Sequence, residues 1–163
     1  MTLSNLSTDR TAINAIKTIL QANLTDPRQQ YTADDRNWIH TDKPLVSATY
    51  PRIQIRKRGP SASAIMSIGQ DFIEWRSMIL DIQFWTKAPF RWKNTDNAYL
   101  TDEELCKKWN HDIWTTLKAQ QSDLKTTYGI TGLKMMDDED PFLEPDTQMY
   151  SSIVSIRIWF FRT

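Results

Sequence analysis

Cysteine, glycine and histidine are scarce in this chain of 163 residues, and each shortage excludes a kind of chemistry. The single cysteine, Cys106, excludes an intramolecular disulfide. Four glycines leave almost no material for a glycine-rich phosphate loop. The two histidines, His40 and His111, stand in different segments with no second histidine or cysteine at ligand spacing, so no zinc site is predicted.

Long apolar runs and an excess of either charge are also missing. The longest apolar runs cover about four residues, far short of the roughly 20 that a membrane helix needs, so we expect no membrane partner. Lys and Arg number 20, as do Asp and Glu. The resulting net charge of zero excludes a nucleic-acid binder that is basic throughout, although it leaves room for a local basic patch.

Catalytic motifs are missing as well. Cys106 lacks an activating histidine, because His111 lies five residues further along the predicted helix and off its face. The acidic run 137–140 has neither the alternating spacing nor the central glycine of an EF-hand, and a solvated loop is favoured over an ion site. We therefore expect a protein that is not an enzyme and that needs no cofactor or metal.

Hydrophobic periodicity is what the sequence does contain. Apolar residues recur at helical spacing over 8–24 and 101–121, and Thr101 with Glu104 forms a capping box at the second start. Alternating apolar residues predict strands. In strands 74–87 and 149–161, the residues expected to face the two helices are Met78, Leu80, Ile82, Phe84, Val154, Ile156, Ile158 and Phe160. The predicted strands are 52–57, 64–68, 74–87, 129–136 and 149–161, with a turn at 58–60.

These elements follow the order α-β-β-β-α-β-β along a single domain, 1–163. The order predicts an α+β fold in which an antiparallel sheet of about five strands carries two helices on one face. Three long loops separate the elements, at 25–50, 87–100 and 137–148. Loops of this length are usually functional or ordered by a partner.

Charge is balanced overall but unevenly placed. Nine basic residues face three acidic ones between Lys43 and Lys93, whereas Asp137 to Asp146 holds six acidic residues and no basic one. Opposite patches are typical of proteins that contact copies of themselves or partners in a set register. Basic side chains interleaved with aromatic ones also suit stacked bases of single-stranded nucleic acid. An ordinary solvated surface is the third interpretation.

Four features of the chain occur together in one known family. They are the helix 8–24 that runs into a long loop, the strand start Tyr50-Pro51-Arg52-Ile53-Gln54-Ile55, the strand 79–87 that leads towards the second helix, and the closing hairpin 130–161. In these features and in its length the chain resembles the tail-terminator, or tail-completion, proteins of long-tailed phages and tailed archaeal viruses.

The resemblance implies a structural virion protein without catalytic residues. Such a protein looks like a hexameric ring that caps the tail tube, stops its growth and presents a surface to the neck. Its partners would be copies of itself, the tail tube protein and a neck or head–tail connector protein, with genomic DNA only passing through the channel. It would be assembled in the host cytoplasm and reside in the tail or neck of the virion.

Charged and aromatic residues are the predicted contacts of such a ring. Trp85, Trp92 and Trp159 are expected to be exposed anchors, because aromatic residues carry much interface energy. The acidic run would either pair with the basic segment 52–58 of a neighbour or line the channel and repel DNA. The candidate interface residues are Arg52, Arg56, Lys57, Arg58, Trp85, Arg91, Trp92, Lys93, Asp137, Asp138, Glu139 and Asp140.

A different class of function stays open at this point. A single-stranded nucleic-acid-binding module would use the basic and aromatic loops, with stacking on tryptophan and phosphate contacts from arginine and lysine. Its candidate residues are Arg52, Arg56, Lys57, Arg58, Arg91, Trp92 and Lys93.

Overall fold

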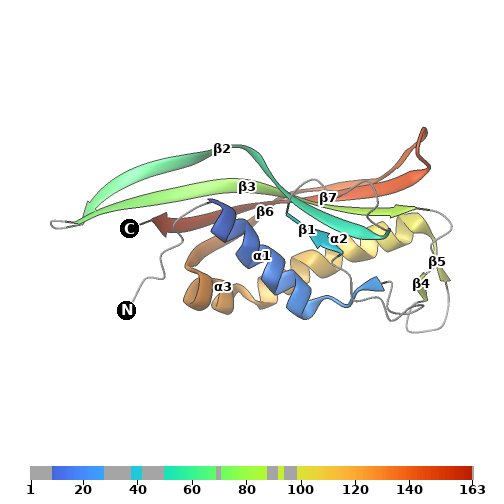
Figure 1. Cartoon of the computed structure of the whole chain (residues 1–163), viewed down its shortest axis with the longest axis horizontal. Coiled ribbons are helices and arrows are strands. Elements are labelled where there is room, and N and C mark those ends of the chain that lie inside the picture. Colours follow the sequence, from blue (N-terminus) through green and yellow to red (C-terminus); the bar gives the residue numbers. More distant parts are fainter. Residues whose placement is uncertain are drawn as a thin grey trace.

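The protein has an α+β fold in which three helices lie against one face of a five-stranded sheet (Figure 1). A computed structural model describes residues 9–27, 38–41, 50–68, 71–87, 92–93 and 99–162. The predicted fold class is confirmed. The predicted number of two helices is not confirmed, because a separate third helix follows the second predicted one.

The main sheet is mixed, in the order β1-β2-β3-β7-β6. The short strand β1 (Ile39–His40) runs parallel to β2, and every other neighbouring pair is antiparallel. The long strands are β2 (Arg52–Ile68), β3 (Asp71–Lys87), β6 (Ile130–Glu144) and β7 (Met149–Arg162). Two further short strands, β4 (Trp92–Lys93) and β5 (Tyr99–Leu100), pair with each other.

The helices are α1 (Asp9–Asn23), α2 (Asp102–Ala119) and α3 (Gln121–Tyr128). The predicted capping box is present: the Glu104 amide donates to the Thr101 hydroxyl, and the Thr101 amide donates to the Glu104 carboxylate at 2.8 Å. Gln120 separates α2 from α3, and α3 ends at Gly129 with φ of 69°, the left-handed conformation that suits glycine. No helix of the described segments has the length and apolarity to cross a membrane.

The predicted turn at 58–60 is wrong, because strands 52–57 and 64–68 form one continuous strand, β2. β3 pairs with β2 on both sides of this point, and only the register shifts, between Arg58 and Ala62. Gly59 has φ of 68°, and Pro60 beside it has no amide to donate. The pair therefore produces a bulge inside the strand rather than a reversal of the chain.

The predicted acidic loop 137–148 is also largely strand. β6 continues to Glu144 along β7, and only the turn at 145–148 is left. Carboxylates are compatible with this edge strand because their side chains stay exposed while the backbone pairs on one side. The predicted loops 25–50 and 87–100 contain β1, β4 and β5. Their segments 28–37, 42–49, 88–91 and 94–98 lie outside the described residues.

The core lies between the sheet and the helices. The predicted inward residues of β3 and β7 are confirmed, each at most 2 % exposed: Met78, Leu80, Ile82, Phe84, Val154, Ile156, Ile158 and Phe160. They pack against Ile16 and Leu20 of α1 and against the buried face of α2. Alternation in the strands and the helical stripe therefore meet in one apolar layer.

We expect Leu80→Ala to destabilise the protein by about 2–5 kcal/mol, because Leu80 is fully buried and truncation leaves a cavity. Leu143→Ala is the matched control, since Leu143 is 39 % exposed and should cost about 0.5 kcal/mol or less. Chemical denaturation of both variants measures the difference. Equal midpoints for the two variants would contradict this assignment of the core.

Candidate interaction surface

Alternation along the strands creates an outer face, on the side of the sheet away from the helices. Because Leu80 and Ile82 point to the helices, Asp81 and Gln83 point outward. Both are buried all the same, with 3 % and 5 % exposure. Arg56 and Arg58 of β2 reach across β3 to Asp81, and the Gln83 amide donates to the Ser151 hydroxyl.

The Asp81 carboxylate joins three strands on this face. Nε of Arg58 lies 2.9 and 3.0 Å from its two oxygens, and Nε of Arg56 lies 3.7 Å away. The Ser155 hydroxyl of β7 donates to the same carboxylate at 2.9 Å and accepts from Nη2 of Arg58 at 2.9 Å. A buried carboxylate is tolerated when it is paired and hydrogen-bonded in this way. The network therefore links β2, β3 and β7.

The acidic run of β6 is divided between two sides of the strand. Asp137 and Glu139 pair in register with Ser155 and Ile153 on the outer face. The hydrogen bond to Asp81 raises the pKa of Arg58 against the opposing effect of burial, and the charges of Asp81, Glu139 and Asp137 add to it. Asp137 and Glu139 thus already act on the basic residues of their own chain.

Asp140 acts instead on α2. The Lys107 pKa is raised first by its hydrogen bond to Glu103, with the charge of Asp140 as a smaller contribution in the same direction. Asp138, Glu139 and Asp140 border a cavity of about 240 Å³ that Lys107 of α2 also lines. The strand conformation therefore turns one acidic run of sequence into two separate surface features.

Lys57 points to the helix side, opposite to Arg56 and Arg58, and its Nζ lies 2.6 Å from Oδ2 of Asp9 at the start of α1. Asp9 also accepts from the Ser61 hydroxyl at 2.9 Å and from Arg76 at 3.4 Å. Burial opposes ionisation of Asp9, but the bonds from Lys57 and Ser61 and the charges of Lys57 and Arg76 outweigh it and lower the pKa. This contact anchors α1 to β2 and β3.

The basic segment 52–58, expected to contact a neighbouring copy, therefore uses much of its charge within its own chain. Lys57 and Arg58 hold structural contacts within the chain, and Arg56 keeps about half of its side chain exposed. Arg52 lies over the Tyr50 ring, with its guanidinium carbon 4.3 Å from the ring centroid. Arg56, Lys57 and Arg58 each pair with Asp81 or Asp9, and Arg56 has the most exposed side chain of the three.

The expected exposure of Trp92 is wrong. Its side chain is 9 % exposed and packs edge-on against Trp109, with ring centroids 6.2 Å apart. Lys93 beside it is exposed, with Nζ 5.3 Å from the Tyr99 ring centroid. The alternation of β4 sends one side chain inward and the other to solvent. Arg91 lies outside the described residues.

The other two predicted anchors are half-buried on the outer face. Trp85 lies at the end of β3, in register with Arg52 and Ser151. Trp159 covers Gly132 of β6, where an added Cβ would meet the indole Cε3 at 2.9 Å. The indole therefore shields the backbone of a glycine on the edge strand, and Trp159 serves its own sheet.

Exposed apolar residues on β6 were missed by the sequence analysis. Met136, Phe142 and Leu143 are 41 %, 45 % and 39 % exposed, and Trp75 of β3 is 39 % exposed. Assigning residues 137–148 to a loop hid the strand that carries two of them. The signal was the pair Phe142-Leu143 among acidic residues, since large apolar residues are unusual in a solvated loop.

The two side chains considered for nucleophilic chemistry, His111 and Cys106, lie in different surroundings. His111 is exposed on α2, with Nε2 3.4 Å from the Thr115 hydroxyl. Cys106 is fully buried, and burial raises the pKa of its thiol to about 12. Within the described segments, no group of His, Cys, Asp and Glu is arranged to hold a metal ion.

No family model matches this chain, and no curated protein matches it. Among solved structures, it is similar to a chain of the virion of a native gene transfer agent particle. That match has a TM-score of 0.46 and 11 % identity, over 96 % of this chain and 98 % of the other. A likeness of this degree assigns neither a family nor a function.

We expect Asp81→Asn to destabilise the fold by about 1–2 kcal/mol. The amide keeps the shape but leaves Arg58 without its partner charge, and the value is at the low end for a charged hydrogen bond because the arginine side chain is 46 % exposed. Asp137→Asn, an exposed neighbour on the same face, should change stability by about 0.5 kcal/mol or less. Denaturant titrations measure the free energy of unfolding of both variants. A loss for Asp81→Asn no larger than that for Asp137→Asn would contradict a stabilising role of the Asp81 network.

The native Cys106 thiol should not react with a disulfide reagent such as DTNB at mildly alkaline pH. It is buried and its raised pKa keeps it protonated, whereas the thiolate is the reactive form. One equivalent should react once the chain is unfolded in guanidinium. A Ser63→Cys variant, at an exposed position, is the positive control. Rapid native reaction of the parent protein would refute the buried placement.

Proposed function

We propose that this chain is a structural virion protein of the tail-terminator kind. In this proposal it forms a hexameric ring that caps a tail tube and joins it to a neck or connector protein, while genomic DNA only passes through. It is assembled in the host cytoplasm and has no catalytic task. The sequence resemblance supports the proposal, and its motifs fall on defined elements: Tyr50 to Ile55 leads into β2, and 79–87 forms the end of β3.

The observation that carries the proposal is a sheet with two open edges. In the described strand order, β6 is the last strand on one side along all its 15 residues. On the other side, β1 pairs with Ile53 and Gln54, and no other described strand pairs with that side of β2. Copies arranged in a closed ring remove such edges, because each copy covers the edge of the next.

The outline of the molecule fits a contact between unlike ends. β2 and β3 extend well past the helices at one end, and the hairpin of β6 and β7 bends away from the helices at the other (Figure 1). The second end carries exposed Phe142 and Leu143 together with the acidic residues of β6. A head-to-tail contact between different surfaces of identical copies closes into a ring when the rotation between them allows it.

Pairing of the acidic run 137–140 with a neighbouring copy involves fewer residues than the sequence suggested. Asp137 and Glu139 act on Arg58 of their own chain and Asp140 acts on Lys107, so Asp138 is the carboxylate better placed for a partner. Arg56, with about half of its side chain exposed, is the matching cation on β2. Such a pairing sets orientation and register more than affinity.

The nucleic-acid alternative has less support. It needs tryptophan faces and arginine side chains that are open to bases and phosphates. Trp92 is buried against Trp109, and Arg58 is bound to Asp81 and Ser155. Trp92 is thus part of the core and Arg58 is held within the chain, while Lys93 and about half of the Arg56 side chain stay exposed.

Size-exclusion chromatography with light scattering, over a range of protein concentrations, tests the proposed ring. We expect a hexamer at high concentration and ring-shaped particles in negative-stain micrographs. The double change Phe142→Ser and Leu143→Ser should shift the protein to monomers, since exposed apolar residues on the edge strand supply contact energy. Tyr99→Ser, which removes a 51 % exposed aromatic residue outside the main sheet, is the control and should leave the ring intact.

A protein that stays monomeric at every concentration would refute the ring. A monomer that binds a single-stranded oligonucleotide, with an affinity that falls steeply as salt is added, would favour the nucleic-acid alternative instead.

A further inference from the structure

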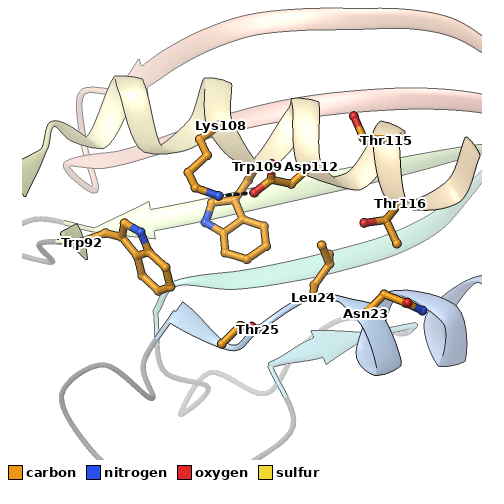
Figure 2. Close-up of a pocket in the computed structure, with 9 residues that line it drawn as sticks. All are labelled: Asn23, Leu24, Thr25, Trp92, Lys108, Trp109, Asp112, Thr115 and Thr116. Carbon is orange, nitrogen blue, oxygen red and sulfur yellow. Dashed lines mark hydrogen bonds and ion pairs between the residues drawn. The ribbon is translucent and has the colours of Figure 1, made fainter. Parts of the chain in front are cut away.

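The cavity between α1 and α2 has a volume of about 280 Å³, and its reactive groups are already engaged with one another (Figure 2). The two charged residues that line it, Lys108 and Asp112, form an ion pair. Trp92 and Trp109, which also line it, are buried against each other. Large apolar side chains that stay open to solvent lie elsewhere, on the sheet.

Four large apolar residues lie side by side on the outer face of the sheet. Trp75 of β3 is opposite Phe161 of β7 in the strand register, with Ile79 four residues from Trp75 and Trp159 two residues from Phe161. They share this face with Asp81, because side chains alternate along each strand. Trp75 is 39 % exposed and the other three are half-buried. These four residues are called the outer apolar patch, and contiguous apolar surface of this kind marks contact sites.

Small residues beside the patch leave room for a ring from a partner. Ala64 and Ala62 of β2 lie opposite Trp75 and Ser77 in the register, and both alanines are exposed. A ring that lies over the alanines meets the Trp75 side chain from the side, in one of the offset or edge-on arrangements that aromatic pairs prefer. The shape of this surface therefore favours an aromatic side chain as its occupant.

Positive charge borders the patch. Arg157 of β7 and Lys134 of β6 are opposite each other in the register, two residues along β7 from Trp159. Lys134 is exposed and Arg157 is half-buried, and neither is ion-paired with another described residue. Both cations are therefore open to the carboxylates of a partner, which would set the orientation of the contact.

The hairpin of β6 and β7 carries the complementary groups. Phe142, which is 45 % exposed, lies on the outer face because it is in register with Ser151. Glu144 and Asp146 follow it within four residues along the chain. An exposed aromatic ring next to carboxylates thus matches the outer apolar patch and its basic border in both shape and charge.

The hairpin and the patch cannot meet within one chain. The patch lies towards the start of β3 and the end of β7, whereas the hairpin is at the opposite end of these strands (Figure 1). Ser151, beside Phe142, is separated from Trp159 by roughly 25 Å of extended strand, at about 3.3 Å per residue. A second copy of the chain therefore supplies the matching surface, and the contact joins unlike surfaces of identical copies.

We propose that the outer apolar patch receives the β6–β7 hairpin of a second copy of this chain, with Phe142 against Trp75 and carboxylates of the hairpin near Arg157 and Lys134. The inference rests on the proposed function, because it identifies the interface between copies in the ring. The same contact can also propagate into an open chain of copies when the rotation between them does not close.

Chemical cross-linking between full-length variants tests the contact. Ala64→Cys carries a thiol beside the patch and Asp146→Cys carries one on the hairpin, while the native Cys106 is buried. A short bis-maleimide should link a mixture of these two variants into covalent dimers. Ser122→Cys, at an exposed position of α3, replaces Ala64→Cys in the control mixture and should give far less product.

Two serine variants test whether the two rings meet. Trp75→Ser and Phe142→Ser should each weaken self-association about thirtyfold, as expected for an interface anchor. The double variant should be no weaker than either single one, whereas independent effects would multiply. Tyr99→Ser, which removes another exposed aromatic residue, should change nothing. Light scattering over a range of concentrations measures association, and circular dichroism verifies that each variant is folded.

The outcomes separate this contact from the ring. Hexamers without preferential cross-linking of Ala64→Cys to Asp146→Cys would overturn the contact and leave the ring in place. Preferential cross-linking within open chains of varied length would support the contact and overturn the ring. A monomer without cross-links would overturn both, and a monomer whose binding to a single-stranded oligonucleotide is lost in Trp75→Ser would assign the patch to nucleic acid instead.

Discussion

The buried carboxylate of Asp81 is the constraint on which the outer face of this protein depends. An ionised group this far from water is costly unless its oxygens are bonded and its charge is matched. Arg58 and Ser155 meet both needs, and they do so from the strands on either side of β3. One residue of β3 therefore joins the side chains of β2 and β7 on this face.

The same constraint shapes the neighbourhood of Asp81. Arg58 of β2 reaches over β3. Directly after Arg58, β2 bulges at Gly59 and Pro60, and its pairing with β3 resumes at Ala62. Asp137 and Glu139 of β6 add to the field around Arg58 from the far side of β7. On this face, opposite the three described helices, Gln83, Ser151 and Ser155 are buried as well.

The other face is organised by an aromatic cluster instead. Trp109 contacts Trp38, Phe84 and Trp92, which come from three separate parts of the chain. The cluster joins the sheet to α2 and to the short strand β4. One face of the sheet is thus held by apolar packing, and the other by a polar network whose cost is offset only when every member is present.

Alternation and capping signals determined much of the fold by themselves. The inward residues of β3 and β7, the helical stripe of α2 and its Thr101 cap were all predictable, because each depends on neighbours within a few residues. The continuity of β2 through Gly59 and Pro60 was not, since local signals favour a turn there and only pairing with β3 overrides them. The start of β6 was predicted as strand 129–136, but its continuation to Glu144 was not, because β7 supplies the partner for an acidic segment with little strand propensity.

The candidate interaction surface shows the same division more sharply. The sequence alone located the charged and aromatic residues but could not tell which are exposed, since burial depends on segments far away along the chain. Trp92 became part of the core because Trp109 lies opposite it, and Arg58 became structural because β3 presents Asp81 beneath it. The sequence by itself determined the residue types and the local hydrophobic periods. Only the tertiary structure decided which side chains are bonded within the chain and which stay exposed. The reason is that strand pairing brings distant residues into contact, as in the bonds of Arg58 to Asp81 and Ser155, 23 and 97 residues away.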